Sequence, residues 1–225
     1  MSKVLYIPCG FRCFTKDVIK ERFGIQQPSL PFDSGYFSSS SRMKFMESGK
    51  VEMNLNNTNP CIKKENLIKD SLRGIDFKEV SYDFINEFIK KNGYNNSYLD
   101  ATKGYYTLVK EFGFVLAHYN WHSSANERIT NPKENIEIVN EILNRRKARL
   151  FAFINDSSEI NLCIYLIHGF STNNKPQPKL KGGIPTGQRF IIINNEYHNL
   201  KDEFALLENY FKQKFEKKKI KLIYL

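Results

Sequence analysis

The residue whose position most suggests chemistry is Cys13, which stands where a predicted strand passes into a predicted helix. The apolar run at 3–7 predicts the strand, and the spacing over 14–23 predicts the helix, which ends at Gly24. A helix N-terminus presents unpaired N–H groups and a partial positive charge. Both favour the thiolate, which is the nucleophilic form of cysteine, and Arg12 adds a cation beside it. Cys13 is therefore the candidate nucleophile.

The cysteines also have other interpretations. Cys13 can serve as a small apolar residue packed beneath the strand, and Cys9 can resolve an oxidised Cys13. The chain has 4 cysteines without the spacing of a disulfide framework, so we expect free thiols. Its N-terminus lacks the apolar run of a signal peptide. These features predict a cytoplasmic protein, or one of the host cytoplasm or virion if the source is viral.

A nucleophilic cysteine needs a base, which is normally a histidine. His118 is the first choice because it follows the apolar run "GFVLA", so it stands at the end of a predicted strand, where the sites of α/β proteins gather. His168 follows "CIYLI" in the same way, whereas His122 and His198 are expected in a loop and a turn. For each histidine, a hydrogen-bonded structural role is the alternative.

The remaining parts of an acyl-transfer site have candidates as well. Asp33, in the loop sequence "PSLPFDSGYF", can orient the imidazole or cap its own turn, and capping is the commoner role. Asn194 is the alternative orienting residue. The backbone N–H groups of Cys13 and Phe14, at the start of the helix, would hold the oxyanion.

Three arginines, Arg145, Arg146 and Arg149, gather in the sequence "NRRKAR". Asn131 and Pro132 predict the start of their helix, and we expect the arginines near its C-terminal end, where cations offset the macrodipole. The functional alternative is a clamp for a phosphate or carboxylate, because the guanidinium fork binds such groups bidentately.

The predicted elements that must position these residues indicate an α/β protein. The unbroken apolar runs "INLCIYLIHGF" and "RFIIIN" predict buried strands, which we expect to be neighbours, and "IKLIYL" predicts a last strand. Helical spacing covers 132–150 and 200–215, and a hairpin is expected around Gly113. Strands that alternate with helices predict one domain over 1–225. We expect three layers, with a mostly parallel sheet, helices on both faces and a loop-rich insertion around 38–100.

Composition excludes several classes of function. The net charge of +10 is spread along the 225 residues, and its densest run, 217–219, closes a predicted helix, so nucleic acid is not expected as the main partner. No apolar stretch approaches the roughly 20 residues that span a bilayer, so no membrane partner is expected. The sequence lacks metal-ligand spacings, a P-loop and a dinucleotide fingerprint, so neither a metal nor a cofactor is expected.

A strand, a glycine-containing turn, a cysteine that opens a helix, and then "PFD" and a serine pair resemble the signature of the papain-like cysteine peptidase family, a domain of unknown function found in bacteria and large DNA viruses. The resemblance covers most of the chain, but only the first forty residues are distinctive. Farther along, His118 in "VLAHYN" resembles the family's histidine, and "EILNRRKARLFAFIN" resembles its arginine-rich helix. The family usually has tryptophan after "PFD", where this chain has Ser34. The resemblance implies a Cys13–His118 pair. Its distinctive residues here are Gly10, Cys13, Phe23-Gly24-Ile25, Ser29, Pro31-Phe32-Asp33 and Ser38-Ser39.

These features support two functions of different class. The first is a thiol-dependent hydrolase that acts on a peptide or other acyl substrate, which is anionic if the arginines contact it. The second is a binding or transferase domain for an anionic ligand, such as a nucleotide sugar or phosphorylated glycan, in which the arginines recognise the ligand and Cys13 only packs. A third outcome is a viral or structural protein that kept the fold and lost the chemistry.

Overall fold

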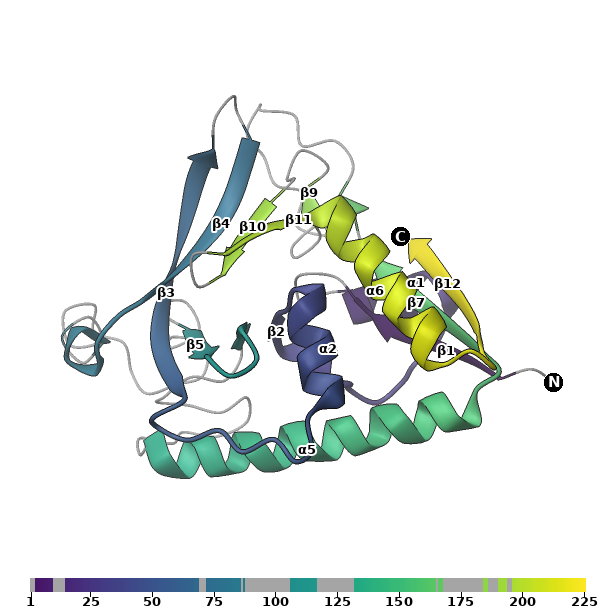
Figure 1. Cartoon of the computed structure of the whole chain (residues 1–225), viewed down its shortest axis with the longest axis horizontal. Coiled ribbons are helices and arrows are strands. Elements are labelled where there is room, and N and C mark those ends of the chain that lie inside the picture. Colours follow the sequence, from purple (N-terminus) through teal and green to yellow (C-terminus); the bar gives the residue numbers. More distant parts are fainter. Residues whose placement is uncertain are drawn as a thin grey trace.

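The computed structural model contains two main sheets, with helices between and around them (Figure 1). The described residues are 3–9, 15–68, 72–85, 87, 106–116, 132–164, 166–167, 184–185, 190–193 and 196–225.

Sheet A is parallel and has three strands in the order β1-β7-β12. Helix α1 (Thr15–Phe23) covers one face, where Ile19 packs against Cys163 and Leu225. The opposite face sends Ile7 and Leu162 into the main core. The strands of sheet A are β1 (Val4–Pro8), β7 (Glu159–Ile164) and β12 (Lys219–Tyr224).

Sheet B has seven strands in the order β11-β10-β4-β3-β5-β6-β2. Its neighbours pair antiparallel, except that β10 pairs parallel with β4. A separate short parallel pair joins β8 (Leu166–Ile167) to β9 (Ile184–Pro185). The strands of sheet B are β2 (Gly35–Tyr36), β3 (Thr58–Ile68), β4 (Leu72–Glu79), β5 (Tyr106–Val109), β6 (Phe114–Leu116), β10 (Phe190–Ile193) and β11 (Glu196–Asn199).

Three helices tie the sheets together. Helix α2 (Ser39–Glu47) lies between sheet A and sheet B, and α6 (Leu200–Lys214) runs beside it over sheet A (Figure 1). Helix α5 (Pro132–Asp156) extends along one side of the molecule, past both sheets. A single 3-10 turn, η1 (Pro31–Ser34), precedes β2.

Local sequence explains where several elements begin and end. Helix α1 stops at Gly24, whose φ of 67° is the left-handed conformation of a helix C-terminus, and the Gly24 N–H donates to the Lys20 carbonyl at 2.9 Å. Gly113, with a φ of 72°, closes the β5–β6 hairpin. Helix α6 carries acidic residues in its first turn and lysines in its last, as its macrodipole favours.

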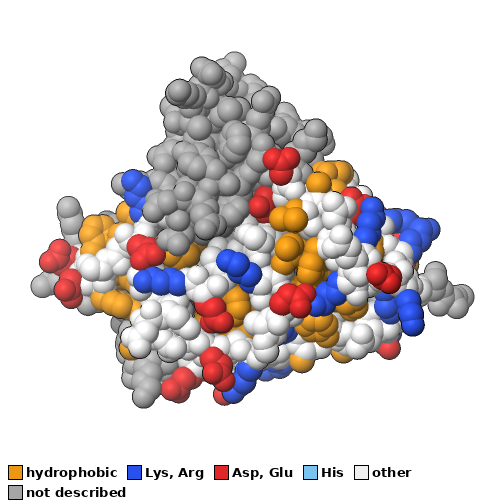
Figure 2. Space-filling view, in the orientation of Figure 1, with side chains coloured by type: hydrophobic (Ala, Val, Ile, Leu, Met, Phe, Trp, Pro, Cys, Tyr) orange, Lys and Arg blue, Asp and Glu red, His pale blue; other side chains and the backbone are white. Residues whose placement is uncertain are grey.

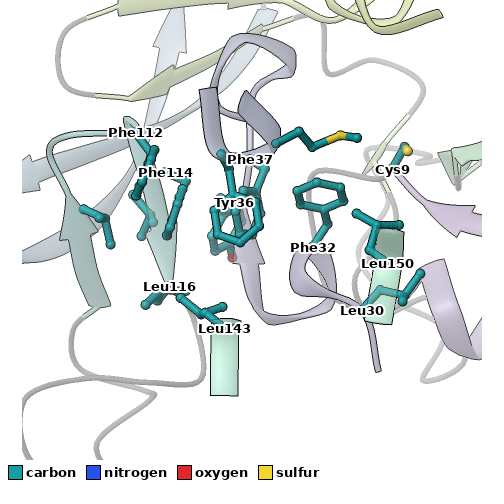
Figure 3. Packing of buried hydrophobic residues seen from close by; sticks show 14 of the residues in the cluster. Cys9, Leu30, Phe32, Tyr36, Phe37, Phe112, Phe114, Leu116, Leu143 and Leu150 are labelled. Carbon is teal, nitrogen blue, oxygen red and sulfur yellow. The ribbon is translucent and has the colours of Figure 1, made fainter. Parts of the chain in front are cut away.

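The core contains a row of aromatic rings that runs from the β5–β6 hairpin to η1 (Figure 3). Phe112 and Phe114 stack with centroids 5.5 Å apart, and Phe114 lies 4.5 Å from Phe37. Phe37 in turn contacts Phe32 edge-on at 5.4 Å. This row packs sheet B against the turn that precedes β2, so the position of η1 is fixed from the core side.

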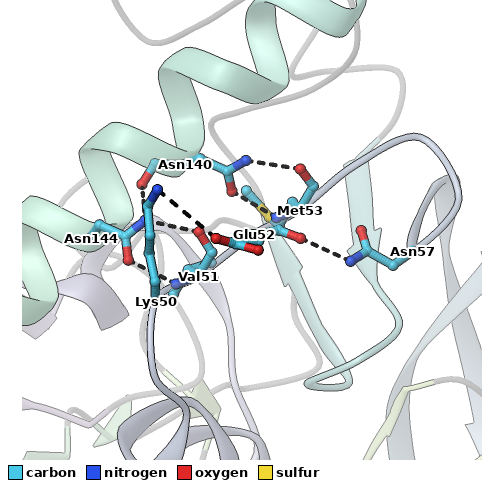
Figure 4. Close-up of polar contacts among 7 residues, drawn as sticks. All are labelled: Lys50, Val51, Glu52, Met53, Asn57, Asn140 and Asn144. Atoms are coloured by element: carbon cyan, nitrogen blue, oxygen red, sulfur yellow. Dashed lines mark hydrogen bonds and ion pairs between the residues drawn. The ribbon is translucent and has the colours of Figure 1, made fainter.

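Two asparagines of α5 hold an extended segment against the helix (Figure 4). Asn144 accepts from the Val51 N–H and donates to the Val51 carbonyl, both at 2.8 Å. Asn140 makes the same pair of bonds with Met53. Asparagines four positions apart share one helix face, so they match alternate residues of an extended chain. The segment thereby satisfies its backbone without joining a sheet.

Charge on the face in Figure 2 is mixed. Acidic and basic side chains alternate over most of it, and Lys and Arg gather most densely toward the end where α6 passes into β12. In β12, Lys219 and Lys221 both contact Glu159, and Lys3 contacts Asp156. Among the described residues, no helix has the length and apolar character needed to cross a membrane.

The predicted α/β class is confirmed, but the sheet arrangement differs from expectation. "INLCI" forms β7 and "FIII" forms β10, and each is interior to its sheet, yet the two lie in different sheets and are not neighbours. The larger sheet is mostly antiparallel. An apolar run indicates that a strand is buried on both faces, but it does not specify which strand pairs with it or in which direction. The expectation of one mostly parallel sheet was therefore wrong.

The expected loop-rich insertion around 38–100 contains regular elements in its described part. Helix α2 and the long hairpin of β3 and β4 fall within it. The run of serines at 38–41 opens this insertion, and serine is a residue that favours turns. Ser38 instead caps α2, because its Oγ accepts from the Ser41 N–H at 3.1 Å.

The asparagine clamp leads to a stability prediction. Asn144→Ala removes three hydrogen bonds, two to Val51 and one to the Asn140 carbonyl. It should lower the free energy of unfolding by about 1–3 kcal/mol, because buried backbone groups lose their partners. Urea denaturation checks the value, with the exposed Glu141→Ala on the same helix as the control. Equal stabilities of the two variants would contradict the clamp.

Candidate active site

The predicted nucleophile and base both lie outside the described residues. Cys13 and Phe14 fall in the segment 10–14, and His118 falls in the segment 117–131. The described residues on either side agree with the predicted order of elements, because β1 ends at Pro8 and α1 begins at Thr15. His122, His168 and Asn194 are outside as well, and His198 is described only as part of the β11 backbone.

Cys9 is a packed thiol. It is fully buried, its N–H donates to the Cys163 carbonyl at 2.7 Å, and burial raises the pKa of its thiol to about 12, against the opposing charge of Arg42. Burial also raises the pKa values of Cys61 and Cys163. Such thiols do not ionise near neutral pH. The three cysteines that the structure describes are therefore poor nucleophiles, and Cys9 is unsuited to the resolving role.

Asp33 occupies the centre of the candidate site. It lies in η1, where its Oδ2 accepts from the Leu30 N–H at 2.8 Å, so it does cap its own turn. Its second oxygen, Oδ1, is buried and has no hydrogen-bond partner among the described residues. Burial raises the pKa of the carboxyl to about 6, while the Leu30 N–H and the charges of Lys16 and Arg146 oppose the rise. One oxygen thus remains available for another donor.

The chain that carries His118 leaves the sheet beside Asp33. Strand β6 ends at Leu116, which pairs with Gly35 of β2, and Gly35 follows Asp33 by two residues. The two strands approach closely here, because a Cβ on Gly35 would lie 2.1 Å from the Val115 carbonyl oxygen. Only glycine fits this contact. The end of β6 is thereby fixed against the segment that carries Asp33.

Arg42 is a buried charge that the sequence interpretation missed. It extends from α2 and is fully buried, with its guanidinium carbon 5.5 Å from the Phe32 ring centre and 5.9 Å from that of Phe37. Burial lowers its pKa, and the neighbouring Cys9 and Glu203 oppose this. The sequence contained only a partial indication of this position. An arginine four residues after a serine N-cap lies on one face of a helix, but no local pattern shows that this face is internal.

The three arginines of α5 do not act as one group. They lie in the middle of α5, which continues to Asp156, so the expected position at a helix C-terminus was wrong and the macrodipole does not explain them. Arg145 is exposed. Arg149 donates to the Ser29 carbonyl at 2.8 Å, and Arg146 lies close enough to Asp33 to lower its pKa. Two of the three therefore face the turn that contains Asp33.

Lys16 of α1 joins these arginines from the other side. Its Nζ donates to the Ser29 Oγ at 3.0 Å, and its charge acts on Asp33. No local pattern indicates this role, because Lys16 is one of many lysines and its partner is 13 residues away. No cluster of three or more His, Cys, Asp or Glu side chains among the described residues is arranged to hold a metal ion.

Comparisons of the chain with family models, with curated proteins and with solved structures found no match. The functional interpretation therefore depends on the residues and geometry described above.

The pKa of Asp33 leads to a prediction about stability and pH. A carboxyl whose pKa rises from 3.8 to about 6 on folding stabilises the fold below its ordinary pKa, and this contribution is lost as the pH rises through about 6. Asp33→Asn cannot ionise and still accepts from Leu30. As the pH rises from 4 to 8, the free energy of unfolding of Asp33→Asn should therefore increase by about 1–3 kcal/mol relative to that of the parent chain. Urea denaturation at several pH values measures this.

The control for that measurement is Glu21→Gln, which removes an exposed carboxylate from α1. It should leave the pH dependence of stability nearly unchanged. If Asp33→Asn and Glu21→Gln follow the same curve, the Asp33 carboxyl ionises as it does in water, and its buried environment is not as described.

Proposed function

We propose that the protein is a thiol-dependent hydrolase in which Cys13 attacks an acyl carbonyl, His118 transfers the proton and Asp33 orients the imidazole. The observation that carries this proposal is the buried Oδ1 of Asp33, an acceptor without a partner among the described residues. A buried carboxylate oxygen strongly favours a donor. The N–H of an imidazole is the donor that such a carboxylate accepts in nucleophilic sites.

The covalent reach of the chain supports His118 as that donor. His118 is two residues beyond Leu116, and Asp33 is two residues before Gly35, the pairing partner of Leu116. Each Cα–Cα step is at most about 3.8 Å, so neither Cα is more than about 8 Å from that strand pair. Because β2 and β6 run antiparallel, residues 33 and 118 lie toward the same end of that strand pair, so the covalent reach permits their side chains to meet.

The described neighbours of Cys13 support its position by the same argument. Cys13 follows Cys9 by four residues and precedes Lys16 by three. The charge of Asp33 acts on Cys9, and the charge of Lys16 acts on Asp33. Asp33 is therefore close to both sides of the short segment that carries the thiol.

The chemistry follows the usual order for a thiol hydrolase. The Cys13 thiolate adds to the acyl carbon, and the N–H groups at the start of α1 stabilise the oxyanion. The bond to the leaving group breaks, and the protonated imidazole of His118 gives it a proton. Water then attacks the carbonyl carbon of the thioester, and His118 takes a proton from that water. The carbon–sulfur bond breaks, which releases the carboxylic acid and restores the Cys13 thiolate with its protonated His118. No cofactor takes part in these steps.

The proposal predicts selective alkylation of Cys13 by iodoacetamide at neutral pH. Cys9, Cys61 and Cys163 should stay unmodified in the folded protein, because each is buried and has a raised thiol pKa. Peptide mass spectrometry after timed labelling locates the modified residue. His118→Ala should slow the labelling of Cys13 by roughly tenfold or more, since a general base contributes at least that much.

His122→Ala is the matched control, because it removes a histidine only four residues from His118. It should leave the labelling rate within about twofold of the parent, since it takes no part in the proton transfer. The hydrolase proposal fails if Cys13 reacts no faster than Cys61. It also fails in its choice of base if the two histidine variants behave alike.

A further inference from the structure

We propose that Lys16, Arg146 and Arg149 form an anion-binding subsite beside the thiol, so that the preferred acyl substrate carries a carboxylate near the bond that is cleaved. This inference depends on the hydrolase proposal for the location of the reaction. The subsite itself is built from described residues of α1, α5 and the turn that contains Ser29 and Asp33.

Lys16 and Arg149 meet at a single residue, although they come from different helices. Lys16 donates to the Ser29 side chain at 3.0 Å, and Arg149 donates to the Ser29 carbonyl at 2.8 Å. Figure 3 shows the adjoining residues Leu30 and Leu150 packed side by side, so the turn lies directly against α5. Two like charges are thus held on either side of one serine.

Arg146 brings a third cation to the same turn. It precedes Arg149 by three residues, so the two share one face of α5. Its charge and that of Lys16 both act on Asp33, and Asp17 is the other carboxylate that does so. Among the described residues, three cations and two carboxylates therefore lie around this turn.

Hydrogen-bond capacity distinguishes these cations from those that only support the fold. Lys147 is nearly buried and donates to four oxygens at the end of α2, so its three N–H groups are fully used. Lys16 and Arg149 are only partly buried, and each makes one hydrogen bond among the described residues. Lysine has three donors and arginine five, so both keep donors for a ligand.

An oxyanion is the ligand that suits these spare donors. A guanidinium and an ammonium that bind the same serine repel each other, and a carboxylate placed between them offsets that repulsion. Arg149 can bind two oxygens at once through its remaining N–H groups. Lys16 follows Cys13 by three residues, so their Cα atoms are no more than about 11 Å apart.

Paired alkylating agents test the subsite directly. Iodoacetate and iodoacetamide both form a carbon–sulfur bond and release iodide, but only iodoacetate carries a carboxylate. We expect the ratio of the iodoacetate rate to the iodoacetamide rate at Cys13 to exceed the ratio for free glutathione by about threefold to tenfold, as one nearby cation would produce. High salt should reduce this excess of the Cys13 ratio over the glutathione ratio.

Single charge removals identify the residues. Arg149→Gln and Lys16→Gln should each return the ratio toward the glutathione value, and the ratio cancels any change in thiol reactivity that both reagents share. Arg145→Gln is the matched control, because it removes the same charge from an exposed position on the same helix. Thermal melting of each variant verifies that the fold is intact, and Arg149→Lys, which keeps the charge, should retain most of the excess.

The outcomes separate the two proposals. If Cys13 reacts rapidly with iodoacetamide but shows the glutathione ratio, the subsite does not exist and the hydrolase proposal stands. An equal loss of the excess in Arg145→Gln and Arg149→Gln would also overturn the subsite, because it would reflect only the general positive field. If neither reagent labels Cys13, the hydrolase proposal fails, and the substrate preference inferred from it fails too.

Discussion

The fold depends on how the two ends of helix α2 are paired. A helix leaves N–H groups unpaired at its start and carbonyls unpaired at its end, and here side chains of two other helices supply the partners. Glu203 of α6 accepts from the Ser39 N–H at one end, and Lys147 of α5 donates to the carbonyls of Phe45, Ser48 and Gly49 at the other. Opposite charges at the two ends also match the macrodipole of α2. The requirements of one helix therefore fix two others around it.

The candidate site is a consequence of this arrangement. With α2 held in place, Arg42 lies over the rings of Phe32 and Phe37, which flank Asp33 and β2. The aromatic row then joins these rings to the β5–β6 hairpin, so the end of β6 cannot shift independently of the turn that contains Asp33. On the other side, Lys16 and Arg149 hold the same turn through Ser29. Asp33 is consequently positioned by contacts from α2, the β5–β6 hairpin, α1 and α5.

Buried charges in this protein have two physical roles. Arg42, Glu203 and Lys147 are almost completely buried and support the packing of α2 against its neighbours. Removing one member of such a set leaves the others without compensation, which is why they are retained despite the cost of desolvation. Asp33, Lys16 and Arg149 keep some exposed surface and some unused hydrogen-bonding capacity. A raised carboxyl pKa beside partly exposed cations is the arrangement expected of a site that handles a proton or an anion.

The sequence by itself determined the local elements. Apolar spacing, together with Pro132, Gly24 and Gly113, predicts these elements because such signals act within a few residues. They are helices α1, α5 and α6, strands β7 and β12, and the β5–β6 hairpin. Asp33 was also found from sequence, since its turn residues and its acid are adjacent. Only the tertiary structure decided that β7 and β10 belong to different sheets, that the serine run begins a buried helix, and that Lys16 meets Arg149 at Ser29. These facts depend on contacts between residues as many as 164 positions apart, as with Ser39 and Glu203, and a local pattern carries no information about such a partner.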